Sequence, residues 1–379
     1  MAASPAVGGV VLDGVDDAAY FALAAQPEYA SVGKLTWSEP GGSFLGSGTL
    51  IAEDWVLTAA HNIDGADGAG SGLNNLKFSV GGATYAAEQW IAEPTWAALG
   101  GDQDLDNYLA GYDIALVKLS SPVEGVAPAT LYAGEDELGL VGTAVGFGSQ
   151  GVGSTGFQAG TAGTKIAGQN VIDAVGPDKS PGSNPFAFNV DNDRLLAVDF
   201  DSPTSPFESR LGDRSPLELE YLIAPGDSGG GLFIDVDGET LLAGVTSFGL
   251  SVDANGPNSD YGDLGGFTRV SSFVDWIEAT LLEVDGPEEL EMHAAVAAGA
   301  VPLTGDANGD GVVDAADLVV FRDLGGDPSE AFENFGSGSL SDSLVVAVVP
   351  EPSAGLLIAV GGLSAGLGRR GGRGPVCGG

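Results

Sequence analysis

A serine set among glycines, Gly226-Asp227-Ser228-Gly229-Gly230, is the stretch that most constrains this chain. A serine hydroxyl is a poor nucleophile unless a base removes its proton and nearby donors stabilise the oxyanion that its attack creates. Glycines allow a tight turn that points backbone N–H groups inward, because they carry no Cβ. The stretch therefore predicts a nucleophile, Ser228, with an oxyanion hole made by the N–H groups of Gly226 and Ser228. The structural alternative is a glycine-rich turn with an incidental serine.

The base and the orienting acid that such a serine needs are both available. The chain has two histidines: His61 ends an apolar strand-like run, whereas His293 lies in an acidic, helix-prone stretch. Asp113 leads directly into another apolar run, where a partly buried carboxylate needs a hydrogen-bonded partner. The chain order His61, Asp113, Ser228 is one in which a Ser-His-Asp triad is known to occur.

The stretches around these three residues resemble the signature blocks of the trypsin/chymotrypsin-like serine peptidases. The blocks are Leu57-Thr58-Ala59-Ala60-His61, Asp113-Ile114-Ala115-Leu116 and the glycine-rich stretch around Ser228. Further similarity lies in Ser247-Phe248-Gly249, Gly266-Phe267-Thr268-Arg269-Val270 and Ser272-Phe273-Val274-Asp275-Trp276-Ile277. The resemblance covers roughly residues 30 to 283. It implies an all-β fold of two six-stranded antiparallel β-barrels with the site between them and a C-terminal helix.

The resemblance also implies a substrate site. Ser247, Phe248 and Gly249 match the strand that pairs with the substrate backbone, and Gly249 and Gly266 match walls of the specificity pocket. The residue at the pocket floor is Leu222, which offers no counter-charge to a basic side chain. We therefore expect large apolar or aromatic residues, rather than Arg or Lys, before the scissile bond.

In this family a freed N-terminal amine commonly binds the aspartate before the nucleophile, here Asp227. No clear basic cleavage site precedes an Ile-Val-Gly-Gly-like start, so activation by processing stays open.

Composition narrows the possible partners. With 53 acidic residues against 13 basic ones, the formal charge is −40, which makes nucleic-acid binding improbable because phosphate contact needs Lys and Arg. The 62 glycines and the 44% hydrophobic content fit a loop-rich β protein with a packed core. The single cysteine, Cys377, excludes an intrachain disulfide, so packing and bound calcium would have to supply rigidity.

A second motif lies after the peptidase-like region, at residues 306–317. It carries oxygen ligands at the spacing that Ca²⁺ needs, with a glycine at the sharp turn. The candidate ligands are Asp306, Asn308, Asp310, Val312 through its backbone carbonyl, Asp314 through a water, and Asp317. With Asp rather than Glu at the last position, the motif resembles a dockerin repeat, although a full dockerin carries two and one is visible here. The alternative is an acidic turn without metal. The calcium would be structural, since the triad needs no cofactor.

The C-terminal stretch from residue 349 to 373 resembles a PEP-CTERM sorting signal. Val349-Pro350-Glu351-Pro352-Ser353 is followed by an apolar run to residue 367 and by three arginines. The run is short for a membrane span, which needs about 20 residues. The resemblance implies delivery to the surface or exterior of a Gram-negative-type bacterium, with a membrane sorting enzyme as partner and transient membrane association. A simple C-terminal anchor is the alternative, and no signal peptide is visible in residues 1–30.

The expected domains follow from these motifs. They are an N-terminal segment (1–29), the peptidase domain (30–283), a linker (284–303), the calcium repeat (304–336), a second linker (337–348) and the sorting signal (349–373). We expect an exported serine endopeptidase that acts on proteins or peptides. The alternatives are a non-catalytic calcium-binding surface or matrix protein on the same scaffold, with an extracellular matrix or surface partner, and an esterase using the same triad.

Overall fold

The computed structural model describes residues 9–64, 73–101, 105–176, 193–205, 208–212, 214–251 and 258–285, and two short strands, 347–349 and 357–359. The chain divides into two compact units, Met1–Ala300 and Val301–Gly379.

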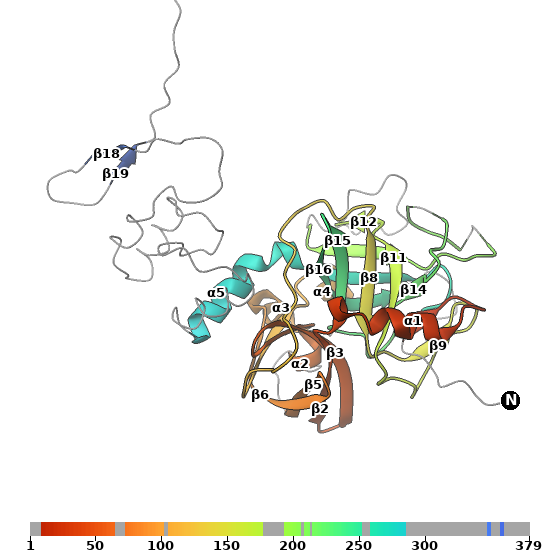
Figure 1. Cartoon of the computed structure of the whole chain (residues 1–379), viewed down its shortest axis with the longest axis horizontal. Coiled ribbons are helices and arrows are strands. Elements are labelled where there is room, and N and C mark those ends of the chain that lie inside the picture. The colour runs from red at the N-terminus through yellow and green to blue at the C-terminus, as the bar shows by residue number, and fades with distance from the viewer. Residues whose placement is uncertain are drawn as a thin grey trace, which may run out of the picture. The chain divides into compact units, whose positions relative to one another are not determined.

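The first half of the larger unit is a closed antiparallel barrel with the strand order β2-β3-β4-β7-β6-β5 (Figure 1). Its strands are β2 (Val32–Glu39), β3 (Gly42–Ala52), β4 (Trp55–Thr58), β5 (Asn74–Val80), β6 (Ala83–Ala92) and β7 (Ala115–Leu119). In β5, buried Leu76, Phe78 and Val80 alternate with more exposed polar residues, which places one face of the strand in the core. The connections carry three short helices, α2 (His61–Asp64), α3 (Pro94–Leu99) and α4 (Leu105–Leu109).

The second half is built on a seven-stranded antiparallel sheet with the order β11-β8-β15-β16-β17-β13-β12. Its strands are β8 (Val141–Gly146), β11 (Ile166–Val171), β12 (Ala174–Val175), β13 (Leu195–Asp199), β15 (Gly231–Val236), β16 (Glu239–Leu250) and β17 (Leu264–Arg269). The predicted all-β fold with two barrel-like sheets is confirmed. The second sheet nevertheless differs from the predicted six-stranded barrel, because in the part of the chain described here β11 and β12 end the sheet without pairing with each other.

A four-stranded sheet, β10-β9-β1-β14, lies beside the β11 edge. Its strands are β1 (Gly9–Val11), β9 (Gln150–Val152), β10 (Gly156–Gln158) and β14 (Tyr221–Leu222). A Cβ added at Gly168 of β11 would lie 2.2 Å from the Cβ of Tyr221, so glycine is what allows β14 to approach this closely.

Residues 9–29, which belong to the predicted N-terminal segment, pack against the rest of the larger unit. Strand β1 pairs with β9 on one side and β14 on the other. Helix α1 (Asp17–Ala24) follows, with Asp16 accepting from the Ala18 N–H at its N-terminus and Tyr20 fully buried. A 3₁₀ turn, η1 (Pro27–Tyr29), leads from α1 into the barrel.

The last described elements of the larger unit are a 3₁₀ turn, η3 (Val270–Ser272), and helix α5 (Val274–Asp285). The helix starts at Val274, directly after the Phe273 that follows the 3₁₀ turn. Ile277 and Leu281 are buried. At the far end, Asp285 accepts from the Trp55 indole and binds Lys118, which fastens the helix to the first barrel.

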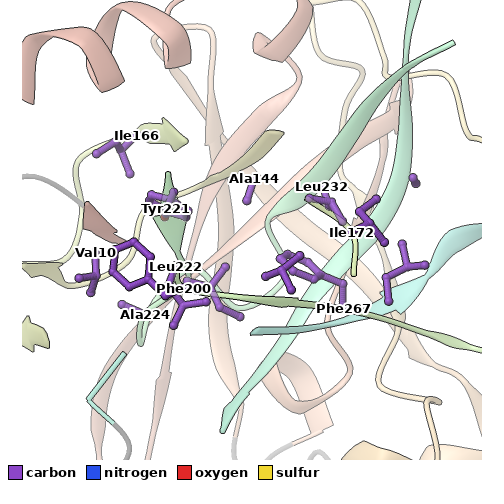
Figure 2. Packing of buried hydrophobic residues seen from close by; sticks show 14 of the residues in the cluster. Val10, Ala144, Ile166, Ile172, Phe200, Tyr221, Leu222, Ala224, Leu232 and Phe267 are labelled. Atoms are coloured by element: carbon purple, nitrogen blue, oxygen red, sulfur yellow. The ribbon is translucent and has the colours of Figure 1, made fainter. Parts of the chain in front are cut away.

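The hydrophobic core has three main clusters. One fills the first barrel, and another lies within the second half, where Figure 2 shows Val10, Ile166, Tyr221 and Phe267 among its members. The third joins strands of both halves to α5 and includes Trp55, Phe233 and Ile277. This shared cluster fixes the two sheets against each other, and the residues predicted to be catalytic lie along their junction.

In the smaller unit, β18 (Ala347–Val349) and β19 (Leu357–Ala359) form an antiparallel pair. The predicted calcium repeat and most of the predicted sorting signal lie outside the described residues. Among the described residues, no helix is both long and apolar enough to cross a membrane.

Candidate active site

Asp113 and His61 form a hydrogen-bonded pair at the start of α2. His61 Nδ1 lies 2.8 Å from Asp113 Oδ2, and the His61 backbone N–H donates to Oδ1 at 2.9 Å. Asp113 is fully buried, and the Ser247 hydroxyl also donates to its Oδ2. An ionised carboxylate only accepts, so this contact places the Nδ1 proton on the side of Asp113 and the basic lone pair on Nε2.

An aromatic ring packs near the imidazole of His61, whose side chain is 17% exposed. The ring of Tyr108 lies 5.7 Å from that of His61 and contacts Trp96 and Phe248 in edge-on geometry. The sequence reasoning missed Tyr108, because nothing local to residue 108 indicates that α4 packs against the histidine.

Ser228 lies in a tight turn between β14 and β15. Gly226 has φ +105° and Gly229 has φ +83°, conformations that residues with a Cβ adopt only under strain. Within the described part of the chain, the N–H groups of Gly226 and Ser228 donate to no protein acceptor. Backbone donors without a protein acceptor in the turn that carries a serine hydroxyl are what an oxyanion hole requires.

Contacts from the first barrel hold this turn next to the histidine. The Ser228 carbonyl accepts from the Ser47 N–H and from the Asn62 side-chain amide, both at 2.8 Å. The Ser47 hydroxyl donates to the Gly226 carbonyl at 2.9 Å. Because Asn62 directly follows His61, these bonds bring the serine and the histidine, 167 positions apart in the chain, to the same junction. The sequence reasoning missed Ser47 and Asn62, although the position of Asn62 beside the histidine was an available signal.

Asp227, which precedes the serine, is buried and fully hydrogen-bonded. Its Oδ1 accepts from the Gly148 N–H at 2.7 Å, and its Oδ2 accepts from the Tyr221 hydroxyl at 2.8 Å and from the Ala224 N–H at 2.9 Å. Burial raises the pKa of Asp227 to about 6, against the lowering effect of these hydrogen bonds. Its partners in the described part of the chain are therefore a tyrosine and two backbone amides.

A pocket of about 420 Å³ opens beside Ser228. Of the predicted substrate-binding residues, Ser247, Phe248 and Gly249 line it. Leu222 does not line it; its side chain is 1% exposed and belongs to the core cluster of the second half, and the residue pairs with Val10 of β1. The rest of the lining is Phe157, Ile223, Ala224, Pro225, Thr246, Leu250, Ser259, Asp263 and Leu264.

Two further features of the pocket could not be read from local sequence. Gly266 also lies outside the lining, since a Cβ there would be 2.4 Å from the Phe248 ring, which covers it. Asp263, 2% exposed, is the acidic residue that lines the pocket within the described part of the chain.

No group of three or more His, Cys, Asp or Glu side chains in the described residues is arranged to hold a metal ion. The predicted calcium ligands, Asp306 to Asp317, fall outside those residues.

The family models and the curated relatives indicate one family. The trypsin-like peptidase domain family matches residues 46–243, more than half of the chain, and the trypsin family matches residues 215–277. Human chymotrypsin-like elastase family member 1 is 30% identical over 245 residues, covering 61% of this chain and 78% of the relative. Brachyurin from Leptuca pugilator is 30% identical over 233 residues, covering 61% of this chain and 85% of the relative. A solved structure of HL collagenase aligns with a TM-score of 0.47 and 22% identity, over 72% of this chain and 97% of that one. This chain belongs to the trypsin-like serine peptidase family.

Proposed function

We propose that this protein is a serine endopeptidase in which Ser228, His61 and Asp113 form the catalytic triad. The proposal rests on the contacts that bring His61 and the Ser228 turn together where the two sheets meet. Asp113 holds the His61 ring through Nδ1, and Asn62 and Ser47 hold the Ser228 turn against the same edge of the barrel. Family membership supports peptide bonds as the substrate class.

The geometry supports a two-step acyl-enzyme route. Ser228 Oγ attacks the scissile carbonyl carbon while His61 Nε2 takes the hydroxyl proton, and the N–H groups of Gly226 and Ser228 stabilise the oxyanion. The intermediate collapses when His61 gives that proton to the leaving amine, which leaves an ester on Ser228. Water then attacks this ester with His61 again as base, and the carboxylic acid product leaves as the Ser228 hydroxyl is restored. Buried Asp113 stabilises the imidazolium in both steps.

A fluorophosphonate probe tests the nucleophile. We expect stoichiometric labelling of the wild type, none of Ser228→Ala, and normal labelling of Ser154→Ala, an exposed serine that serves as the matched control. Asp113→Asn should lower kcat by about 10³- to 10⁴-fold with little change in KM, because the imidazole loses its correct tautomer. Labelling at another serine would overturn the assignment, and hydrolysis of esters without amides would favour the esterase alternative.

We also propose that the pocket prefers large apolar or aromatic side chains before the scissile bond. Phe157, Ile223 and Leu264 supply apolar surface to the lining, in which Asp263 is the acidic residue among the described residues. A peptide-library profile tests this in the wild type and in Asp263→Asn. Cleavage mainly after Arg or Lys, lost on Asp263→Asn, would overturn the preference and assign Asp263 as the counter-charge.

We further propose that the chain is exported, carries structural calcium at residues 306–317 and is processed by a membrane sorting enzyme near its C-terminus. The support is the spacing of oxygen ligands and the C-terminal pattern in the sequence. Mass spectrometry of the mature protein from envelope and medium tests the processing. Calcium titration of the full chain against Asp306→Ala/Asp310→Ala tests the repeat. An uncut C-terminus would favour a simple anchor, and equal calcium affinity in both proteins would overturn the metal assignment.

A further inference from the structure

The carboxylate of Asp227 joins the segments that define the nucleophile turn. It accepts from Ala224 at the start of the turn and from Gly148 in the neighbouring loop. Cβ atoms added at Gly146 or Gly148 would both lie 2.3 Å from its oxygens, so the carboxylate fills a cradle that only glycines leave open. A displacement of this side chain would therefore change the direction of the N–H groups on either side of it.

The third donor, Tyr221, is itself firmly held. It is 2% exposed in β14 and packs with Val10 and Ile166 in the second core cluster (Figure 2). A Cβ at Gly9 would lie 2.1 Å from its hydroxyl oxygen, so β1 closes directly over the ring. The hydroxyl points from this core to Asp227 Oδ2 at 2.8 Å.

We infer that Tyr221 is a positioning residue, whose hydroxyl fixes the Asp227 carboxylate and thereby the turn that presents the Gly226 and Ser228 N–H groups. The inference deepens the proposed peptidase function and rests on it for its kinetic readout. In this arrangement a buried side chain holds the aspartate that precedes the nucleophile. The ring of the same tyrosine connects the N-terminal strand β1 to the active site.

The expected signature is a change in pH dependence. The groups packed around the carboxylate in the described residues are Gly146 of β8, Gly148, Ala224 and Tyr221, of which Tyr221 is titratable. Its hydrogen bond lowers the pKa of Asp227 against the effect of burial, so removing the hydroxyl raises that pKa from about 6 toward neutrality. A protonated Asp227 is a poorer acceptor for the Gly148 and Ala224 amides, and the turn loosens as pH falls.

The experiment compares Tyr221→Phe with Tyr20→Phe. Tyr20 is a fully buried tyrosine of the same cluster, and its hydroxyl bonds Leu12 and Glu220 rather than the turn. After both variants are shown to be folded by circular dichroism, kcat and KM are measured across pH on one peptide substrate. We expect Tyr221→Phe to lower kcat at pH 7 by about tenfold, with KM nearly unchanged, and to move the acidic limb of kcat/KM upward by about one pH unit. Tyr20→Phe should leave that limb in place.

An unchanged acidic limb in folded Tyr221→Phe, or an equal shift in both variants, would overturn the inference. Titration of ¹³C-labelled wild type keeps the test independent of the variants. The Tyr221 Cζ shift should follow the Asp227 carboxyl titration with one shared midpoint, and separate midpoints would contradict the contact. If the wild type hydrolyses no peptide, the proposed function fails, whereas the NMR comparison of wild type and Tyr221→Phe still decides the positioning role.

Discussion

At the scale of single residues, the site depends on a few positions that accept only one type of residue. Gly226 is the clearest of them, because it combines φ +105° with close neighbours. A Cβ there would lie 3.1 Å from the Gly148 Cα and 3.2 Å from a Leu45 methyl carbon. The absence of a side chain therefore serves both the turn and the packing around it.

We expect Gly226→Ala to lower kcat/KM by at least about 10²-fold, because the strained turn moves an oxyanion donor. It should also reduce the free energy of unfolding by about 1–3 kcal/mol. Gly238→Ala is the matched control, with φ +89° but open space around its Cβ position. It should lose comparable backbone stability and keep its activity, as measured by peptide hydrolysis and thermal melts. Equal activity of both variants would contradict the role of Gly226.

At the scale of elements, a cluster of buried carboxylates joins β12, β13 and β14. Asp173, Asp199, Asp201 and Glu220 are all at most 6% exposed. Burial and the neighbouring Asp199 raise the pKa of Asp173 to about 9, and burial raises the pKa of Glu220 to about 8. Burial also raises the pKa of Asp199, against lowering hydrogen bonds from the Arg210 and Leu211 N–H groups. The folded protein therefore retains protons here that the unfolded chain releases above about pH 4.

The sign of the resulting pH dependence follows from proton binding. A native state that binds more protons than the unfolded state loses stability as pH rises, so the free energy of unfolding should fall from about pH 4 to about pH 9. We expect Asp173→Asn to flatten this slope and to raise Tm at pH 8 by about 2–4 °C or more, with little change at pH 5. Glu218→Gln, an exposed acid beside the cluster, should leave the slope unchanged. A wild-type Tm that rises from pH 5 to pH 8 would contradict the proposal that these buried carboxyl groups keep their protons in the folded state.

At the scale of the whole molecule, charge opposes folding. The formal charge of −40 brings many carboxylates within each other's field when the chain compacts. Salt shortens the range of that repulsion from about 10 Å at 0.1 M to about 3 Å at 1 M. Only 13 basic residues are present to offset it, and Lys118 and Arg269 are already used in buried pairs with Asp285 and Glu137.

We therefore expect Tm to rise by several degrees between 0.05 and 1 M NaCl, because screening relieves the folded state more than the expanded one. Sucrose at matched osmolality is the control that separates screening from general preferential exclusion. A Tm that is flat or falls in NaCl would show that local ion pairs outweigh the net charge.

The sequence alone determined the family, the all-β class and the residues proposed for the triad. Those conclusions rested on short stretches whose meaning is local: a glycine-framed serine, a histidine at the end of an apolar run and an aspartate at the start of another. Alternating burial in strands such as β5 is likewise a local pattern, so barrel strands could be recognised before their partners were known.

Only the tertiary structure decided what holds those residues together. Tyr221 reaches Asp227 because Gly9 and Gly168 leave room for its ring, and Ser47 and Asn62 reach the serine turn from another sheet. The pocket lining was decided in the same way, since the fold turns Leu222 into the core and Asp263 toward the cavity. These contacts join residues far apart in the chain, and they depend on how two sheets meet. A local sequence pattern does not predict these contacts, because the contacts form only when hydrophobic burial brings the two sheets together.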